Sequence, residues 1–198
     1  MVFDGIDSST MGDSSRFLTL TALEDSLASL LPFPKDEGTV VLIVRRLDGG
    51  QREILGEVVV SVEGGIQGDS WSRQKDRNPD AQIAVMEAGV AELIANGQPI
   101  ALFGDSLFLD LDLSTQNLPE HSRVRVGDVM LNVTAVPHNG CLKFKGRFGQ
   151  DALRFVSKPE LRSNNLRGIY MRVEIPGIIR VGDPVIVISR GNLSDEKV

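Results

Sequence analysis

Apolar residues near the start of the chain follow a helical repeat, whereas later ones form short extended runs. Leucines recur at helical spacing from residue 20 to residue 31, and Pro32 ends the run. This pattern predicts a short amphipathic helix. The helix could pack on the main domain or on a partner.

Beyond Gly38, short apolar runs alternate with glycine turns. Runs rich in β-branched and aliphatic residues predict strands at 39–44, 54–62, 81–85, 108–113 and 169–175. Short helices are expected over 87–96 and near 149–156. Segments 125–131 and 180–186 each place a Gly-Asp turn before an apolar strand, which predicts two equivalent hairpin corners. Many strands and few helices predict a mainly β fold with short helices (α+β), built as a closed or nearly closed β-barrel.

Composition divides the chain into three parts. We expect residues 1–37 to be an acidic, partly disordered extension that carries the leucine helix. Residues 38–190 are expected to form the barrel domain, and residues 191–198 a flexible tail.

The overall composition is that of a globular protein. Of the 198 residues, 41% are hydrophobic and 24% are charged. No apolar run approaches the ~20 residues of a membrane span. The N-terminus is acidic where a secretory signal would be basic, and a single cysteine agrees with a reducing compartment. We therefore expect a cytoplasmic protein with no membrane partner.

Charge is unevenly distributed along the chain. The net charge is −6, but the stretch from Lys143 to Arg172 holds eight basic and two acidic residues, a net +6 that leaves −12 elsewhere. Such a stretch suits a small anionic ligand, such as a phosphate, or forms a solvated basic face. Nucleic-acid binding is not expected, because the whole chain is acidic and has few aromatic residues for base stacking.

Cys141 is the only cysteine, so it cannot form a disulfide within the chain. It follows a Pro-x-x-Gly turn, with His138 before it and Lys143 and Lys145 after it. Positive charge beside a cysteine favours the thiolate, the form that binds metals and attacks electrophiles. A buried apolar filler is the alternative. A nucleophile–base pair of Cys141 and His138 is also conceivable.

Several common motifs are absent. The chain has no G-x-G-x-x-G, no P-loop and no G-x-S-x-G elbow. With two histidines, one cysteine and no C-x-x-C, a structural zinc site is not expected.

Seven short motifs follow one another in an order that resembles the MOSC domain, named for the C-terminal domain of molybdenum-cofactor sulfurases. The resemblance covers residues 39–189. The motifs are Gly65-Ile66-Gln67-Gly68-Asp69, Gly104-Asp105-Ser106-Leu107, Val126-Gly127-Asp128, the 137–143 loop, Arg167-Gly168 with Val173, Pro176-Gly177 and Val181-Gly182-Asp183.

The resemblance implies a β-barrel with small helices that binds the molybdenum cofactor (molybdopterin) or handles sulfur destined for it. Cys141 corresponds to the family's loop cysteine, so the resemblance implies that its thiolate is the catalytic metal ligand. Arg167 is the first candidate for the cofactor's phosphate, followed by Arg172 and Lys143. The other candidate cofactor-binding residues are Asp69, Asp105, Ser106 and His138.

Two motifs depart from the family pattern. The usual Gly-Glu-Asn-Leu is here Gly104-Asp105-Ser106-Leu107, which keeps a carboxylate but loses an amide. The usual Gly-Asp-Arg-His is here Gly68-Asp69-Ser70-Trp71, which removes a basic pair. Asp69 could instead cap a turn, and Trp71 could cover a planar ligand or pack a loop.

Three functions are consistent with the resemblance. The first is a molybdenum-cofactor oxidoreductase that transfers an oxygen atom and reduces small N-hydroxylated compounds. The second is a sulfur carrier or cofactor-delivery module with a persulfide on Cys141, and the third is a barrel that has lost its cofactor. The chain carries no pyridoxal-phosphate desulfurase domain, ferredoxin-like cysteine cluster or flavin motif, so we expect a separate electron-transfer or sulfur-donor protein. Pyridoxal phosphate belongs to the larger fused sulfurases.

Overall fold

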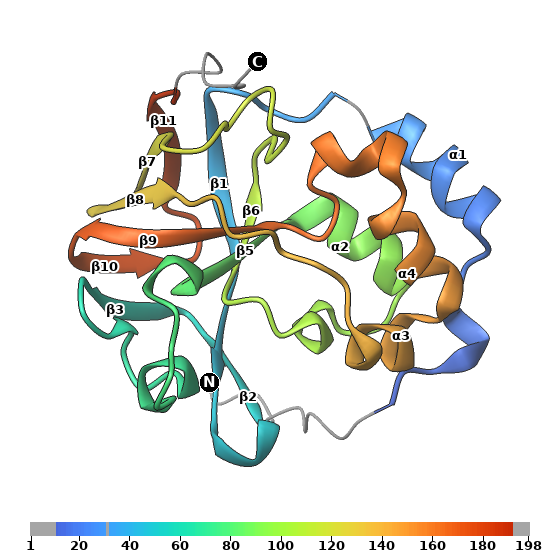
Figure 1. Cartoon of the computed structure of the whole chain (residues 1–198), viewed down its shortest axis with the longest axis horizontal. Coiled ribbons are helices and arrows are strands. Elements are labelled where there is room, and N and C mark those ends of the chain that lie inside the picture. The colour runs from blue at the N-terminus through green and yellow to red at the C-terminus, as the bar shows by residue number, and fades with distance from the viewer. Residues whose placement is uncertain (1–10, 31, 192–198) are drawn as a thin grey trace.

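A closed barrel forms the centre of the molecule (Figure 1). The computed structural model describes residues 11–30 and 32–191. In the described chain, seven strands close the barrel in the order β1-β11-β7-β8-β9-β5-β6 and back to β1. These strands are β1 (Glu37–Arg46), β5 (Ile83–Glu87), β6 (Leu107–Asp110), β7 (Arg123–Val126), β8 (Val129–Val133), β9 (Ile169–Ile175) and β11 (Pro184–Ser189).

Further strands lie outside this ring. Strand β2 (Arg52–Leu55) pairs with the end of β1. A small antiparallel sheet is formed by β3 (Glu57–Ser61), β4 (Gly65–Ile66) and β10 (Gly177–Arg180). Within the barrel, β5 and β6 are parallel, because a helical connection carries the chain back to the same end.

Branched aliphatic residues fill the barrel, because every second side chain along its strands points inward. Strand β7 alternates exposed arginines with buried valines, and β9 buries every second residue. The expectation of a mainly β barrel with short helices is confirmed. The strands expected at 39–44 and 169–175 are present, whereas the region 54–62 divides into β2 and β3 and the strand expected at 108–113 ends at Asp110.

The two Gly-Asp turns are not equivalent. Gly127-Asp128 joins β7 to β8, which pair as a hairpin. Gly182-Asp183 joins β10 in the small sheet to β11 in the barrel, so the expectation of a second hairpin corner is wrong. The second turn instead hydrogen-bonds to the backbone of Val40 in β1, at 2.8 and 3.0 Å.

Helices gather on one side of the barrel, at the right of Figure 1. They are α1 (Leu20–Leu30), α2 (Ala88–Ala95), α3 (Leu142–Phe148) and α4 (Gln150–Ser157). Short 3-10 turns connect the elements: η1 (Ser14–Arg16), η2 (Asp48–Gly50), η3 (Ser70–Arg73), η4 (Pro79–Ala81), η5 (Ile100–Phe103) and η6 (Pro159–Asn164). No helix in the described ranges is long and apolar enough to cross a membrane.

The leucine helix α1 packs on the main domain, one of the two placements that the sequence allows. Leu23 and Leu27 are buried in the same apolar cluster as Ile94 of α2 and Phe155 of α4. Residues 1–10, at the start of the predicted disordered extension, and residues 192–198 of the predicted tail lie outside the described part of the chain.

Glu87 ends β5 and caps α2 from a buried position. Its carboxylate accepts hydrogen bonds from the backbone N–H groups of Gly89 (3.0 Å) and Val90 (2.6 Å). Burial is the main cause that raises the pKa of Glu87 to about 7, although these hydrogen bonds lower it. A raised carboxyl pKa means that folding favours the protonated form. Its contribution to stability is therefore present below the ordinary value of 4.5 and is lost as the pH rises through 7.

We expect Glu87→Gln to remove this pH dependence. The difference in free energy of unfolding between wild type and variant should change by about 3 kcal/mol between pH 4.5 and pH 8, with the wild type relatively less stable at high pH. Urea denaturation of both proteins across that range measures it. Taking the difference cancels groups that titrate in both proteins, and a difference that is constant with pH would contradict the assignment.

Candidate functional site

A buried carboxylate joins three of the residues that the sequence singles out. Asp105 is 0% exposed, between η5 and β6. The Nη1 of Arg167 donates to its Oδ2 at 2.7 Å, and the Nδ1 of His138 lies 3.4 Å from its Oδ1. Residues 105, 138 and 167 come from three separate loops at the ends of barrel strands. The fold therefore brings together an acid, a base and a cation that are far apart in the sequence.

Arg167 is held on several sides. It is only 8% exposed, and its guanidinium carbon lies 5.4 Å from the ring centroid of Phe144 and 6.0 Å from that of Phe103. Its Nη1 also lies 4.0 Å from the Sδ of Met86. Asp105 is the charged partner of this cation, since the aromatic rings carry no net charge. The Asp105–Arg167 pair therefore fixes a guanidinium at the end of the barrel.

His138 packs against Tyr170 in a tilted arrangement, with ring centroids 4.3 Å apart and an interplanar angle of 35°. Burial lowers the pKa of His138 to about 4; Asp105 opposes this shift, while Arg167 and Arg46 add to it. The imidazole is therefore neutral at pH 7. Burial also raises the pKa of the Tyr170 hydroxyl, with Asp105 and Cys141 adding to the effect and the two arginines opposing it. At pH 7 the hydroxyl is thus a hydrogen-bond donor.

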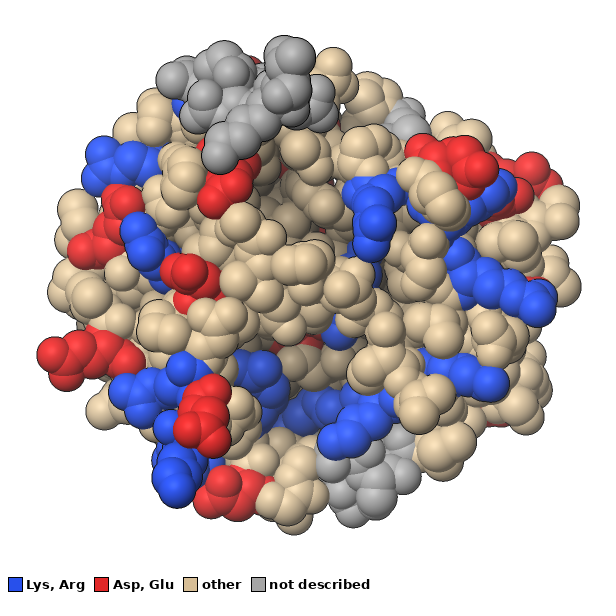
Figure 2. All heavy atoms as spheres, viewed as in Figure 1, with Lys and Arg blue, Asp and Glu red and all other residues tan. Residues whose placement is uncertain are grey.

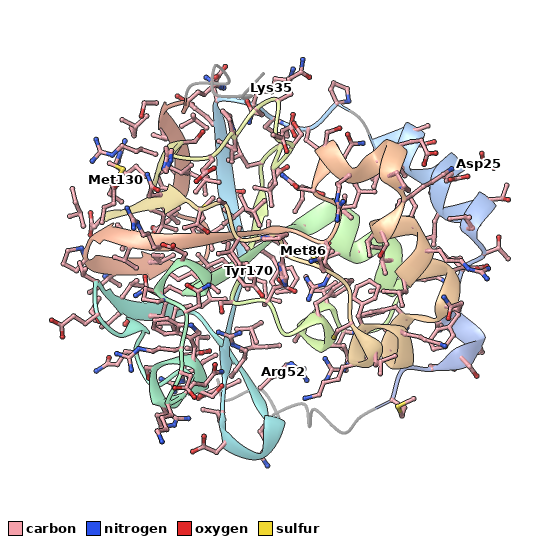
Figure 3. The ribbon with its side chains drawn as sticks, in the orientation of Figure 1. Asp25, Lys35, Arg52, Met86, Met130 and Tyr170 are labelled. Atoms are coloured by element: carbon pink, nitrogen blue, oxygen red, sulfur yellow. The ribbon has the colours of Figure 1, made fainter. Side chains whose placement is uncertain are left out.

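Three further arginines lie near this network, and together with Arg167 we call them the arginine cluster: Arg46, Arg52, Arg147 and Arg167. The guanidinium of Arg52 lies against Gly104, the residue before Asp105. Arg147 donates to the carbonyl of Leu102 at 2.8 Å, and burial lowers its pKa, with Arg167 adding to the shift and Cys141 opposing it. Figure 2 shows basic side chains around a hollow in this face. The hollow lies between Tyr170 and Arg52 as labelled in Figure 3.

Asp69 holds Arg46 in place. It is buried, and its carboxylate accepts from the Arg46 Nε (3.1 Å), Nη2 (2.9 Å) and backbone N–H (2.8 Å). It also accepts from the backbone N–H of Trp71 at 2.8 Å, so the turn-capping role is confirmed. Trp71 is buried and carries the Arg77 guanidinium 5.4 Å from its ring centroid. Trp71 therefore packs the loop.

Cys141 is exposed, immediately before α3. The alternative of a buried apolar filler is therefore wrong. Cys141 raises the pKa of both Arg147 and Tyr170, which places it within electrostatic reach of these two residues. The thiol is accordingly open to solvent.

The remaining candidate residues are placed differently. Ser106 is buried next to Asp105, and its Oγ has no hydrogen-bond partner among the described residues. Lys143 is exposed on α3. The side chain of Arg172 is 51% exposed on the outer face of β9 and lies 3.4 Å from Asp80. Of the basic residues expected to meet a phosphate, only Arg167 contacts Asp105 in the described structure.

Four residues of the site were not singled out from the sequence: Arg46, Arg52, Arg147 and Tyr170. One of them carried a usable signal. Arg147 shares its side of α3 with Phe144 and Phe148, at the spacing that marks a buried face. Arg46 ends an apolar strand and Tyr170 is the only tyrosine, but neither pattern is specific.

A cavity of about 600 Å³ adjoins the network. Residues 133–139 and parts of 156–169 line it, and it shares His138 and Arg167 with the site. In the described structure, several buried polar atoms here make no hydrogen bond: Asp105 Oδ1, Ser106 Oγ, His138 Nδ1 and Arg167 Nε. Buried polar atoms in this state are typical of a site that binds a polar ligand.

Comparison with known proteins agrees with this geometry. The model of the MOSC domain matches residues 76–186, more than half of the chain. The chain belongs to the MOSC domain family. No curated protein matches.

Solved structures show the same fold at low identity. A crystal structure described only as a hypothetical protein is 19% identical, with a TM-score of 0.56 over 81% of this chain and 71% of that one. YuaD from Bacillus subtilis is 16% identical, with a TM-score of 0.53 over 78% and 97% of the two chains. YiiM from Escherichia coli is 20% identical, with a TM-score of 0.51 over 78% and 71%. The MOSC family is associated with the molybdenum cofactor.

The residues of the site fit that cofactor. Cys141 offers a sulfur donor that is open to an incoming ligand, and sulfur donors suit soft metal centres. The arginine cluster supplies guanidinium groups for a phosphate. The unbonded buried atoms of Ser106 and Arg167 could meet polar groups of an organic ligand.

Proposed function

We propose that this MOSC protein binds the molybdenum cofactor beside the arginine cluster, with the Cys141 thiolate as a metal ligand, and acts as an oxidoreductase on small N-hydroxylated compounds. The observation that carries the proposal is an exposed thiol within electrostatic reach of Arg147 and Tyr170, in a fold that also holds a buried Asp105–Arg167 pair. When bound, the cofactor supplies a metal centre that exchanges an oxygen atom with a substrate.

The chain's own residues would bind and orient the ligand. The guanidinium groups of Arg46, Arg147 and Arg167 would neutralise anionic groups, and the carboxylates of Asp69 and Asp105 keep two of them in position. Neutral His138 and the protonated Tyr170 hydroxyl would offer hydrogen bonds without adding charge. The solvent exposure of Cys141 leaves room for a small substrate to approach.

A sulfur-carrier or cofactor-delivery role is the second candidate, with a persulfide on Cys141. One observation favours it: a carrier needs a thiol that a partner protein can reach, and Cys141 is exposed. The two functions differ in whether metal stays bound to the purified protein.

Molybdenum content decides between them. The full chain and Cys141→Ser, each made in a host that synthesises the cofactor, are compared by elemental mass spectrometry at equal folded concentration. We expect near-stoichiometric metal in the wild type and a loss of about tenfold or more in the variant, because serine is a poor substitute for a soft thiolate. Absence of metal from both proteins would overturn permanent cofactor binding. Cyanolysis of the wild type would then test Cys141 for a persulfide.

A further inference from the structure

The exposed side of α3 presents an apolar residue next to the thiol. Phe144, Arg147 and Phe148 are buried on one side of this helix. Leu142 lies opposite them and is 82% exposed, more than any other large hydrophobic residue in the described ranges. Single exposed leucines are ordinary, but this one directly follows the exposed Cys141.

A second apolar residue extends this face. Met11 is 70% exposed and its side chain lies over Gly146, one helical turn beyond Leu142. The backbone N–H of Gly12 donates to the carbonyl of Gly146 at 3.1 Å, which holds the segment there. We call Cys141, Leu142, Met11 and the flanking lysines Lys143 and Lys145 the α3 face.

Basic side chains frame these apolar residues. Lys143 and Lys145 project on either side of Leu142, and both are exposed. Neither forms an ion pair within the described part of the chain. The exposed Arg162 in η6 is likewise outside the ion pairs found there, whereas Asp151 is paired with Arg154. An apolar centre with a charged rim is the usual composition of a protein–protein interface.

Charge indicates the kind of partner. From α3 through η6 the chain carries six basic residues and two acidic ones. In Figure 2, basic side chains lie over the helical half of the face, and acidic ones gather toward α1. Arg154 and Lys158 are paired with Asp151 and Glu24, and Arg147 is buried, so the exposed charge without an ion pair among the described residues belongs to Lys143, Lys145 and Arg162. This positive charge favours an acidic partner and speeds the encounter with it.

We propose that the α3 face is the docking site for an acidic protein that presents an apolar side chain to Leu142 and thereby reaches Cys141. The proposal rests on the proposed function only in taking Cys141 as the reactive group. The apolar centre distinguishes such a partner from a nucleic acid, because a nucleic acid offers phosphates but no aliphatic side chain for Leu142.

Thiol–disulfide exchange on the metal-free full chain tests this docking site. The probes are short peptides that contain leucine and a cysteine held as a mixed disulfide with thionitrobenzoate, in Glu-rich, Gln-rich and Lys-rich versions. The Cys141 thiolate attacks the peptide sulfur, a Cys141–peptide disulfide forms, and coloured thionitrobenzoate leaves as a thiolate. The second-order rate of this release is measured at low and high salt.

We expect the Glu-rich probe to react about tenfold faster than the Gln-rich probe at low salt, and the advantage to disappear at high salt. Lys143→Glu with Lys145→Glu should abolish the advantage. Leu142→Ser should slow the Glu-rich and Gln-rich probes alike. Arg125→Glu is the matched control: it reverses a charge on β7, across the barrel from α3 in Figure 1, and should leave the rates unchanged.

Three results would overturn the proposal. If the double lysine variant still reacts faster with the Glu-rich probe, the preference would come from the arginine cluster and not from the two lysines. A single-stranded oligonucleotide that binds more tightly than the acidic peptide at the same salt would favour a nucleic acid. Rates that fall for every probe as protein concentration rises would mean that a second copy covers the face. Because no metal is used, each result is independent of the molybdenum measurement.

Discussion

Asp105→Asn should lower the free energy of unfolding by about 3–5 kcal/mol, the cost typical of breaking a buried ion pair from one side. The carboxylate is fully buried and accepts from Arg167 at 2.7 Å. Asparagine is nearly the same size, so it leaves no cavity. It does leave the guanidinium of Arg167 buried between Phe103 and Phe144 without a counter-charge.

The matched control is Asp80→Asn. Asp80 also pairs with an arginine, Arg172 at 3.4 Å, but its side chain is 49% exposed, and exposed pairs contribute only about 0–1 kcal/mol. Urea denaturation of the wild type and both variants gives the comparison. Should Asp105→Asn cost no more than Asp80→Asn, the Asp105–Arg167 pair would not be the interaction that fixes Arg167.

A double variant separates charge from packing. In Asp105→Leu with Arg167→Met, both charges are removed together, so no unpaired buried charge remains. We expect this protein to recover most of the stability lost in Asp105→Asn. Recovery of folding without recovery of molybdenum binding would locate the role of the pair in ligand binding, since the barrel itself would then be intact.

The parts of the fold that the sequence predicts are those with a strong local pattern. Strand β9 is found at the predicted residues because its alternation is regular. Helix α3 was missed: in it, lysines and a glycine interrupt the apolar positions, and it lies where a cysteine loop was expected. The closure of the barrel through β1 and β11 is a long-range pairing, which no local pattern encodes.

The candidate site likewise contains residues that the sequence predicts and residues that it does not. Order of motifs identified Asp105, His138 and Arg167, and the fold brings them into contact. Arg172 was grouped with Arg167 on charge alone, but strand alternation in β9 turns it to the outer surface. Arg147, in contrast, faces the interior, because it lies on the same side of α3 as two buried phenylalanines. Net charge of a stretch therefore predicts a basic region but not which arginines face the site.

Gly168→Ala should lower the free energy of unfolding by about 3 kcal/mol or more, through strain and a backbone clash. Gly168 has φ +92°, a conformation that L side chains rarely adopt, and a Cβ there would lie 2.2 Å from the carbonyl oxygen of Val85. Val85 is in β5, directly beside β9. The backbones at Gly168 and Val85 therefore cannot move apart without separating two paired strands of the barrel.

Gly182→Ala separates these two causes. Gly182 has a similar φ of +87°, but a Cβ there would meet nothing within 4 Å. It should therefore show backbone strain alone, about 1–2 kcal/mol. Thermal unfolding of the two variants measures the difference, and equal losses of stability would mean that β5 moves to accommodate the new methyl group.

If Gly168→Ala folds with β5 displaced, the neighbouring Arg167 must shift relative to Asp105, and molybdenum content should fall in Gly168→Ala but not in Gly182→Ala. The close approach at Gly168 thus ties barrel packing to the position of the buried cation.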